Sequence, residues 1–180
     1  MSTEQANPSG TSSTTSAGTI TIRPAVVADA EAIRRIYNAE VTGQTSTFDL
    51  VPRSLEDQQR WLAARSGAFS AIVATDGDRI VGFGALSAYK DRAAYSTTVE
   101  DSVYVDRSAG GRGIGTLLLS RLVEIARESG FHSVMARIEA SGTASRALHA
   151  KCGFQLVGIE LQVGRKFGRW LDVAVMQILL

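Results

Sequence analysis

Four glycines crowd one short stretch of the chain, in a setting that favours anion binding. Gly110, Gly111, Gly113 and Gly115 lie between an apolar strand-like run, SVYV, and a helical pattern that begins with GTLLL. A glycine-rich turn that enters a helix presents backbone N–H groups and the positive end of the helix dipole. Arg112 adds a cation in the middle of the turn. The stretch therefore predicts a site for a phosphate or pyrophosphate group.

The familiar glycine motifs for nucleotides do not fit this turn. A dinucleotide fingerprint requires G-x-G-x-x-G, yet its last position falls on Thr116 or Leu118. A Walker loop requires Gly-Lys, and the sequence contains no such pair. A turn that needs glycine only for steric reasons remains the alternative to a binding site.

The composition is that of one ordinary domain. The chain has 180 residues, 44% hydrophobic and 21% charged, with a formal net charge of +1. This charge argues against a nucleic-acid binder that relies on bulk charge, and no apolar run is long enough to span a membrane. Cys152 is the single cysteine, and with two histidines it gives no zinc spacing, so we expect no metal. No secretory signal is visible, and the cytoplasm is the default compartment.

The elements that must position the turn alternate along residues 19–180. Residues 1–18 are rich in Ser, Thr and Gly and predict a disordered tail. Strand patterns lie at 19–23, 69–75, 79–88, 96–106, 132–139, 156–164 and 170–180. Four helical patterns are present. Two start after Asp29 and after Ser54, and the other two span about 113–129 and 143–151. This order predicts an α+β domain with one central mixed, mostly antiparallel and twisted sheet flanked by helices.

Several stretches resemble the GCN5-related N-acetyltransferases (GNAT) and, among them, the phosphinothricin N-acetyltransferase group. The stretches are IRPAVVADAEAIRRIYN, STTVEDSVYV, the glycine turn, RALHAKCGF and VGRKFGRWLDVAVMQ. Together the resemblance covers residues 19–180. It implies an acetyl-CoA-dependent transfer of an acetyl group to the α-amine of a small amino-acid-like acceptor, directly within a ternary complex. Phosphinothricin, methionine sulfoximine and methionine sulfone are acceptors of that type.

The resemblance also implies which residues hold acetyl-CoA. They are Val103, Tyr104, Val105, Gly111, Arg112, Gly113, Ile114, Gly115, Thr116 and Ser145. Backbone N–H groups of the strand Val103 to Val105 could also stabilise the oxyanion of the transition state. Two positions depart from the family pattern. Gly110 replaces a Gln or Arg that braces the turn, and Gly142 replaces an Asn, for which Thr143 or Ser145 could substitute.

Acetylation of an amine requires a base, because free amines are mostly protonated at neutral pH. Glu100 occupies the position of the family's general base. Asp101 follows it, and because neighbours in a strand point to opposite faces, we expect only one of the two to face the site. His149 takes the place of a tyrosine that protonates the departing thiolate, so we predict it as proton donor or site-lining residue. We interpret Cys152 as a small core thiol rather than an acyl carrier.

The acceptor end is implied by the same resemblance. Arg92 matches the position that meets the acceptor carboxylate, and Lys90 and Tyr95 are its neighbours. Phe48 and Lys166 are predicted to line the pocket or its rim. The resemblance further implies a homodimer in which such loops complete each other's sites. Two other functions stay open: a protein or peptide N-acetyltransferase, and a non-catalytic module that binds acetyl-CoA.

Overall fold

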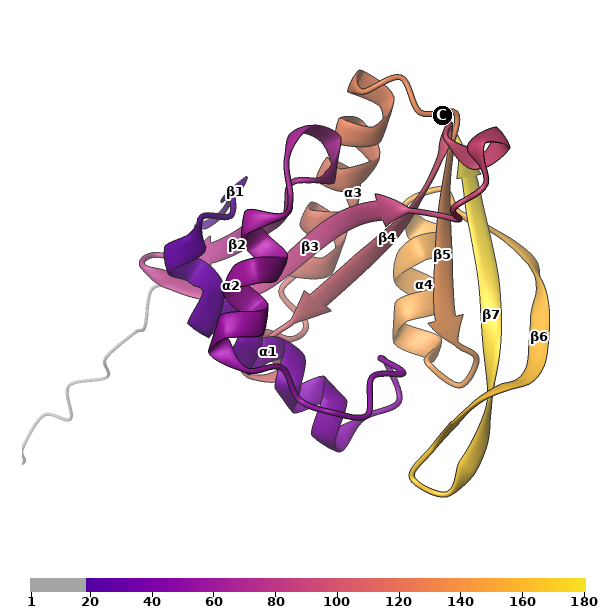
Figure 1. Cartoon of the computed structure of the whole chain (residues 1–180), viewed down its shortest axis with the longest axis horizontal. Helices are drawn as coiled ribbons and strands as arrows, with labels where there is room; N and C mark the ends of the chain where they lie inside the picture. Colours follow the sequence, from indigo (N-terminus) through magenta and orange to yellow (C-terminus); the bar gives the residue numbers. More distant parts are fainter. Residues whose placement is uncertain (1–18) are drawn as a thin grey trace, which may run out of the picture.

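A seven-stranded sheet forms the centre of the computed structural model, which describes residues 19–180 (Figure 1). The predicted tail at residues 1–18 lies outside the described residues. The strands are β1 (Ile20–Pro24), β2 (Ile72–Asp76), β3 (Arg79–Ala88), β4 (Thr98–Val105), β5 (Ser133–Glu139), β6 (Gln155–Lys166) and β7 (Arg169–Leu179). Their order in the sheet is β1-β2-β3-β4-β5-β7-β6. Among the strands of residues 19–180, only the central β4–β5 pair is parallel, so the predicted mixed, mostly antiparallel sheet is confirmed.

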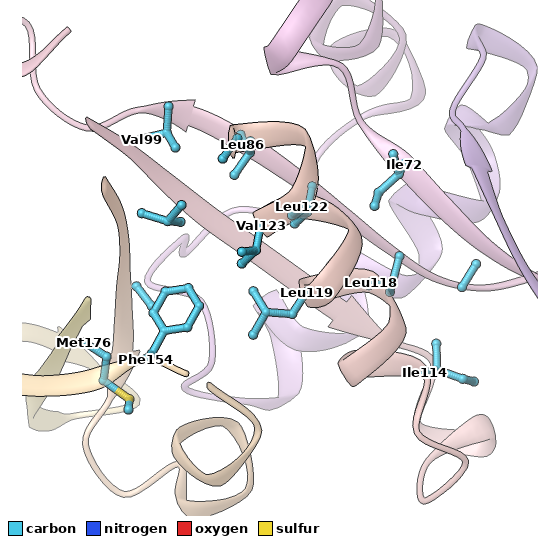
Figure 2. Close-up of a cluster of buried hydrophobic side chains, with 14 of the residues drawn as sticks. Ile72, Leu86, Val99, Ile114, Leu118, Leu119, Leu122, Val123, Phe154 and Met176 are labelled. Atoms are coloured by element: carbon cyan, nitrogen blue, oxygen red, sulfur yellow. The ribbon is translucent and has the colours of Figure 1, made fainter. Parts of the chain in front are cut away.

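Helices cover both faces of the sheet. The helices are α1 (Ala30–Gly43), α2 (Leu55–Ala63), α3 (Ile114–Glu128) and α4 (Thr143–Lys151). Short 3-10 segments lie at Val27–Asp29, Gly67–Phe69, Ala93–Tyr95 and Arg107–Ala109. The buried side chains form two clusters, one beneath α3 and one beneath α1 and α2. Figure 2 shows Leu118, Leu119 and Leu122 of α3 packed toward the strands. The sheet is therefore the middle layer of three.

The helix boundaries follow local sequence signals. Ser54 and Asp57 form the predicted capping box at the start of α2, with the Asp57 N–H donating to Ser54 Oγ at 3.0 Å. Asp29 is the N-cap residue of α1, but its carboxylate accepts from Arg23 and from the Val26 N–H instead of capping the helix. Gly130 follows α3 with a φ of 78°, a left-handed conformation that glycine adopts without strain.

The β4–β5 pair separates soon after it forms. Thr98, Val99 and Glu100 pair with Ser133, Val134 and Met135, and the register records no further partners. Beyond this point the strands move apart in Figure 1, while β4 stays paired with β3 through Val105 and β5 stays paired with β7 through Glu139. The divergence opens a gap in the middle of the sheet.

Candidate active site

A cavity of about 840 Å³ lies at this gap. Its lining comes from β4, β5, the glycine turn, the first turns of α3 and α4, and the loop after α1. The volume is within the range of small-molecule and cofactor sites. Of the residues predicted to bind acetyl-CoA or carry out the transfer, these line the cavity: Glu100, Val103, Tyr104, Val105, Gly111, Gly113, Ile114, Gly115, Thr116, Ser145 and His149.

The glycines of the turn have two different structural roles. Gly111 and Gly113 have φ values of 78° and 74°, and a Cβ at either position would meet no atom within 4 Å. Glycine is therefore needed there for backbone conformation. Gly115 lies in the first turn of α3, where a Cβ would be 3.0 Å from Leu148 Cδ2 of α4. Its small size lets α3 and α4 approach at the edge of the cavity.

The first turn of α3 and the free side of β4 present backbone donors. The first N–H groups of a helix have no partner within it, and Gly113, Ile114, Gly115 and Thr116 all line the cavity. In β4, hydrogen-bonded pairs alternate along the antiparallel ladder with β3. Because the Asp106 N–H donates to Val81 O, the register turns the N–H groups of Val103 and Val105 toward the gap.

The Arg112 side chain is held on the side of the glycine turn that faces away from the cavity. Its Nη1 lies 2.5 Å from Asp76 Oδ2, at the end of β2, and Arg112 is absent from the cavity lining. The ion pair fixes the turn to the β2–β3 hairpin. Its predicted contact with the cofactor stays a prediction.

A second ion pair lies on the cavity side of the turn, just before the glycines. Arg107 donates from Nε and Nη2 to the two oxygens of Glu40, at 2.9 and 3.1 Å. Glu40 is buried near the end of α1 and also accepts from Ser46 Oγ at 2.6 Å. This link between α1 and the β4–α3 connection could not be seen in the sequence, because its partners are far apart along the chain.

Glu100 has the electrostatic setting of a base. Burial raises its pKa, the nearby Arg137 guanidinium opposes this, and the carboxylates of Asp101 and Glu160 raise it further. The net direction is upward, toward the range in which a carboxyl group can take up and release protons near neutral pH. The side chain is only partly exposed and lines the cavity.

Asp101 also borders the cavity, but its carboxylate is enclosed and bound to His149 of α4, so of the two carboxylates Glu100 is the one open to a ligand. The two side chains do lie on opposite faces of β4. The cavity, however, occupies a gap within the sheet, and residues of both faces border such a gap. Both residues therefore border the gap, although their side chains point to different sides of the sheet.

On the α4 side, Asp101 and His149 form a buried pair. Their relative exposures are 7% and 4%, and Nε2 of His149 lies 3.1 Å from Asp101 Oδ2. The other ring nitrogen, Nδ1, lies 2.7 Å from Ser145 O, a carbonyl that can only accept. Burial lowers the pKa of His149, but the hydrogen bond and charge of Asp101 outweigh it and raise the pKa overall. Both ring nitrogens are thus engaged.

Arg137 is a cavity-lining cation that the sequence reading missed. It lies on β5, and its Nη1 donates to Glu160 Oε1 of β6 at 2.9 Å. No spacing rule reveals it, because its position beside the cavity depends on the divergence of β4 from β5.

The predicted acceptor residues separate into three groups. Phe48 lines the cavity. Lys166 is 3% exposed and donates to Thr47 O at 2.7 Å, so it holds the loop that carries Phe48 and does not reach the cavity. Lys90, Arg92 and Tyr95 are exposed in the β3–β4 connection and are not part of the cavity lining of this chain. Lys90 lies 5.2 Å from the centre of the Tyr95 ring.

Gly142 is the N-cap residue of α4, with no side-chain cap. A Cβ at this position would lie 3.0 Å from Glu139 O, the carbonyl that accepts from the Gly142 N–H. A side chain there would require the backbone turn to shift. Ser145, one of the possible substitutes for the usual asparagine, lines the cavity, whereas Thr143 does not.

Within residues 19–180, no cluster of three or more His, Cys, Asp and Glu side chains is arranged to hold a metal ion. None of the helices described in this range combines the length and apolar character needed to cross a membrane.

The chain is similar to known acetyltransferases. The acetyltransferase (GNAT) family model matches residues 30–154. An L-methionine sulfoximine/L-methionine sulfone acetyltransferase from Pseudomonas paraeruginosa is 39% identical over 159 residues, which is 87% of this chain and 92% of that protein.

Two solved structures are also similar. A GNAT superfamily phosphinothricin acetyltransferase from Sinorhizobium meliloti, solved with acetyl-CoA, is 37% identical with a TM-score of 0.85, covering 89% of this chain and 88% of that one. A ribosomal-protein-alanine N-acetyltransferase from Brucella melitensis is 39% identical with a TM-score of 0.87, covering 89% and 99%.

Proposed function

The chain belongs to the acetyltransferase (GNAT) family, and we propose that it transfers an acetyl group from acetyl-CoA to the α-amine of a small amino-acid-like acceptor. Phosphinothricin, methionine sulfoximine and methionine sulfone define the acceptor type. The single observation that carries the proposal is the cavity in the β4–β5 gap. It places a raised-pKa carboxylate, Glu100, at the same opening as the backbone donors of β4 and α3.

The residues present fit acetyl-CoA. The N–H groups of the glycine turn and first turn of α3 suit its pyrophosphate. The gap side of β4, with the N–H groups of Val103 and Val105, suits the pantetheine arm and the acyl oxygen. Ser145 lies on the α4 side of the same cavity. Bound here, acetyl-CoA would supply an activated acyl group, and transfer would be direct.

Glu100 acts as the general base. It takes a proton from the acceptor's ammonium group, directly or through water, and leaves a neutral amine that can attack. His149 lines the cavity, and to act as the proton donor for the departing thiolate it would have to release one of its two ring contacts, with Ser145 O or with Asp101. Asp101 supports that assignment by favouring the protonated ring, since it raises the pKa of His149.

We further propose a homodimer in which Lys90, Arg92 and Tyr95 reach the partner's cavity. These residues are exposed on their own chain and do not line its β4–β5 cavity. The edge strand β6 and its neighbour β7 also expose several large apolar side chains, among them Val157, Leu161 and Trp170. An exposed apolar edge strand is normally covered by another segment or carries charged side chains that prevent further strand pairing. Sedimentation of the purified protein tests for the dimer.

A cytoplasmic location follows from the proposed reaction, because acetyl-CoA is supplied inside cells. Fractionation of cells that express the protein tests it.

The deciding experiment measures thiol release from acetyl-CoA with a panel of acceptors. The panel contains phosphinothricin, methionine sulfoximine, methionine sulfone, ordinary amino acids and a peptide with N-terminal alanine. We expect strong turnover of the first three. Preference for the peptide would instead favour a protein N-acetyltransferase, the activity named for the Brucella melitensis structure. No turnover at all, with acetyl-CoA still raising the Tm, would mean a sound cofactor site and a wrong acceptor class, whereas turnover with any amine would dismiss the non-catalytic module.

A further inference from the structure

Arg137 occupies a position fixed by the sheet register. Glu100 pairs with Met135, the last partner that β4 has on β5. Side chains two residues apart on a strand share a face, so Arg137 lies on the same face as Met135 and Glu100. It is the first residue on that face after the strands separate. Its guanidinium therefore borders the gap on the side of the general base.

The charges around Arg137 agree with this placement. The carboxylates of Glu160 and Glu100 raise its pKa, against the effect of burial, with the Glu160 hydrogen bond the largest cause. Glu100 experiences the same neighbour, because Arg137 opposes the rise in the Glu100 pKa. The two groups are thus close enough to act on one bound molecule.

Glu160 holds Arg137 without using all of its donors. Nη1 donates to Oε1 at 2.9 Å, and Nη2 lies 2.5 Å from Oε2. A guanidinium has five N–H groups in a planar fork, so this pairing leaves donors for a second anion. The Arg137 side chain is 34% exposed and lines the cavity, so a ligand can reach it.

Position separates Arg137 from the other cations that this chain itself brings near the site. Arg107 also lines the cavity and, like Arg137, is paired with one glutamate, but it follows the far end of β4 beside the glycine turn and not Glu100. Lys166 donates to backbone carbonyls. Among the described residues of this chain, Arg137 is the arginine that lines the cavity beside Glu100.

We propose that Arg137 binds the α-carboxylate of the amino-acid acceptor, with Glu160 holding the guanidinium from the β6 side. This assignment rests on the proposed function. In an α-amino acid the amine and the carboxylate are attached to the same carbon. An acceptor whose amine meets Glu100 therefore brings its carboxylate, and not its distal head group, to the neighbouring cation. Arginine suits this contact because its fork matches a carboxylate.

The test pairs the Arg137→Met variant with two acceptors that differ only in the carboxylate. These are methionine sulfone and its decarboxylated analogue, 3-(methylsulfonyl)propylamine. Each variant-to-wild-type ratio is taken for one acceptor at one pH, so differences in amine basicity cancel. We expect kcat/KM for methionine sulfone to fall about 10- to 100-fold, the usual effect of losing a charged hydrogen bond. The ratio for the analogue should stay within about twofold, since it has no carboxylate to lose.

Two further variants sharpen the result. Arg137→Lys keeps the positive charge but loses the planar guanidinium fork. Its kcat/KM for methionine sulfone should therefore lie between those of the wild type and Arg137→Met. Arg127→Met removes an exposed arginine near the end of α3 and should change neither ratio. The rise in Tm with acetyl-CoA, measured for every variant, confirms that each is folded and binds the cofactor.

Equal losses with both acceptors would overturn the assignment, because they would mean that Arg137 acts through Glu100 or through packing. A shifted pH profile with no acceptor discrimination would overturn it in the same way. If the wild type acetylates the amine analogue but no amino acid, the transfer reaction stands and the carboxylate site is wrong. If it acetylates neither, the proposed function fails and the assignment with it.

Discussion

Two consecutive carboxylates, Glu100 and Asp101, border one cavity from opposite faces of β4, and their surroundings differ in almost every respect. Glu100 is partly exposed and has Arg137 as its neighbouring cation. Asp101 is buried and bound to His149 of α4. The first can meet a ligand that enters the gap, and the second is enclosed by the protein.

The difference shows that two consecutive residues of β4 can have different roles where β4 and β5 diverge, because their side chains point to opposite faces of the sheet. Alternation of side chains directs Glu100 to the side of Arg137 and Asp101 to the side of α3 and α4. The gap lets both border the same space. We infer that Glu100 serves the chemistry of the acceptor amine, whereas Asp101 serves the position and charge of His149. This division predicts opposite behaviour for the two variants that neutralise these carboxylates.

The largest effect is expected from Glu100→Gln on turnover. Without the base, the acceptor's ammonium group keeps its proton, so kcat should fall by roughly 10²-fold or more. Acetyl-CoA binding should be retained, because the glycine turn and α3 are untouched. Steady-state kinetics from pH 6 to 9, together with the Tm shift on adding acetyl-CoA, provide the measurement.

Asp101→Asn is the natural comparison for turnover. A greater loss of kcat in Asp101→Asn than in Glu100→Gln would reverse the division between the two carboxylates. Near-normal turnover of Glu100→Gln across the pH range would remove Glu100 as the base altogether.

The parts of this site that depend on local conformation could be predicted from the sequence. The glycine turn could be predicted because positive φ values and an unpaired helix start are properties of a few neighbouring residues, such as Gly111 and Gly113. The strand and helix order was also predictable, because hydrophobic periodicity and capping signals are local. The roles of individual residues came from the family resemblance.

The remainder depends on contacts between distant segments. Asp101 and His149 are 48 residues apart and meet only because α4 packs beside the gap. Arg137 borders the cavity because β4 leaves β5 after Glu100, and no residue pattern marks that point. Lys166, predicted at the pocket or its rim, is instead covered by the loop after α1. In each case tertiary packing determines what the side chain can reach.

The second effect is expected in the stability of Asp101→Asn. Removing the anion leaves His149 buried without its partner, which should lower the free energy of unfolding by on the order of 3 kcal/mol. For a chain of this length that corresponds to roughly 6 to 12 °C in Tm. The folded-state pKa of His149 is raised, so the pair's contribution is fully present below the ordinary histidine pKa and is lost as pH rises through the folded value.

The Tm deficit of Asp101→Asn should therefore be larger at pH 6 than at pH 9. Asp78→Asn, in the exposed β2–β3 turn, is the matched control and should show no comparable deficit at either pH. A deficit of the same size at both values would mean that the pair contributes through packing and not through the charge of His149.

The smallest effect has the opposite sign and concerns the stability of Glu100→Gln. Burial raises the folded-state pKa of Glu100, so folding favours its protonated form. The contribution of protonated Glu100 to the free energy of unfolding is present below the ordinary glutamate pKa. It is lost as the pH rises through the folded-state pKa of Glu100. At pH 8 the wild type therefore carries the cost of a partly buried charge, which glutamine does not.

The Tm of Glu100→Gln should accordingly exceed that of the wild type by a few degrees at pH 8, and the two should converge as pH falls toward 4.5. Glu56→Gln, an exposed change in the first turn of α2, should follow the wild type throughout. A catalytic group that lowers stability is expected where function requires a charge in a poorly solvated place. If Glu100→Gln were less stable than the wild type at pH 8, Glu100 would be a structural carboxylate like Asp101, and the contrast between the two faces of β4 would disappear.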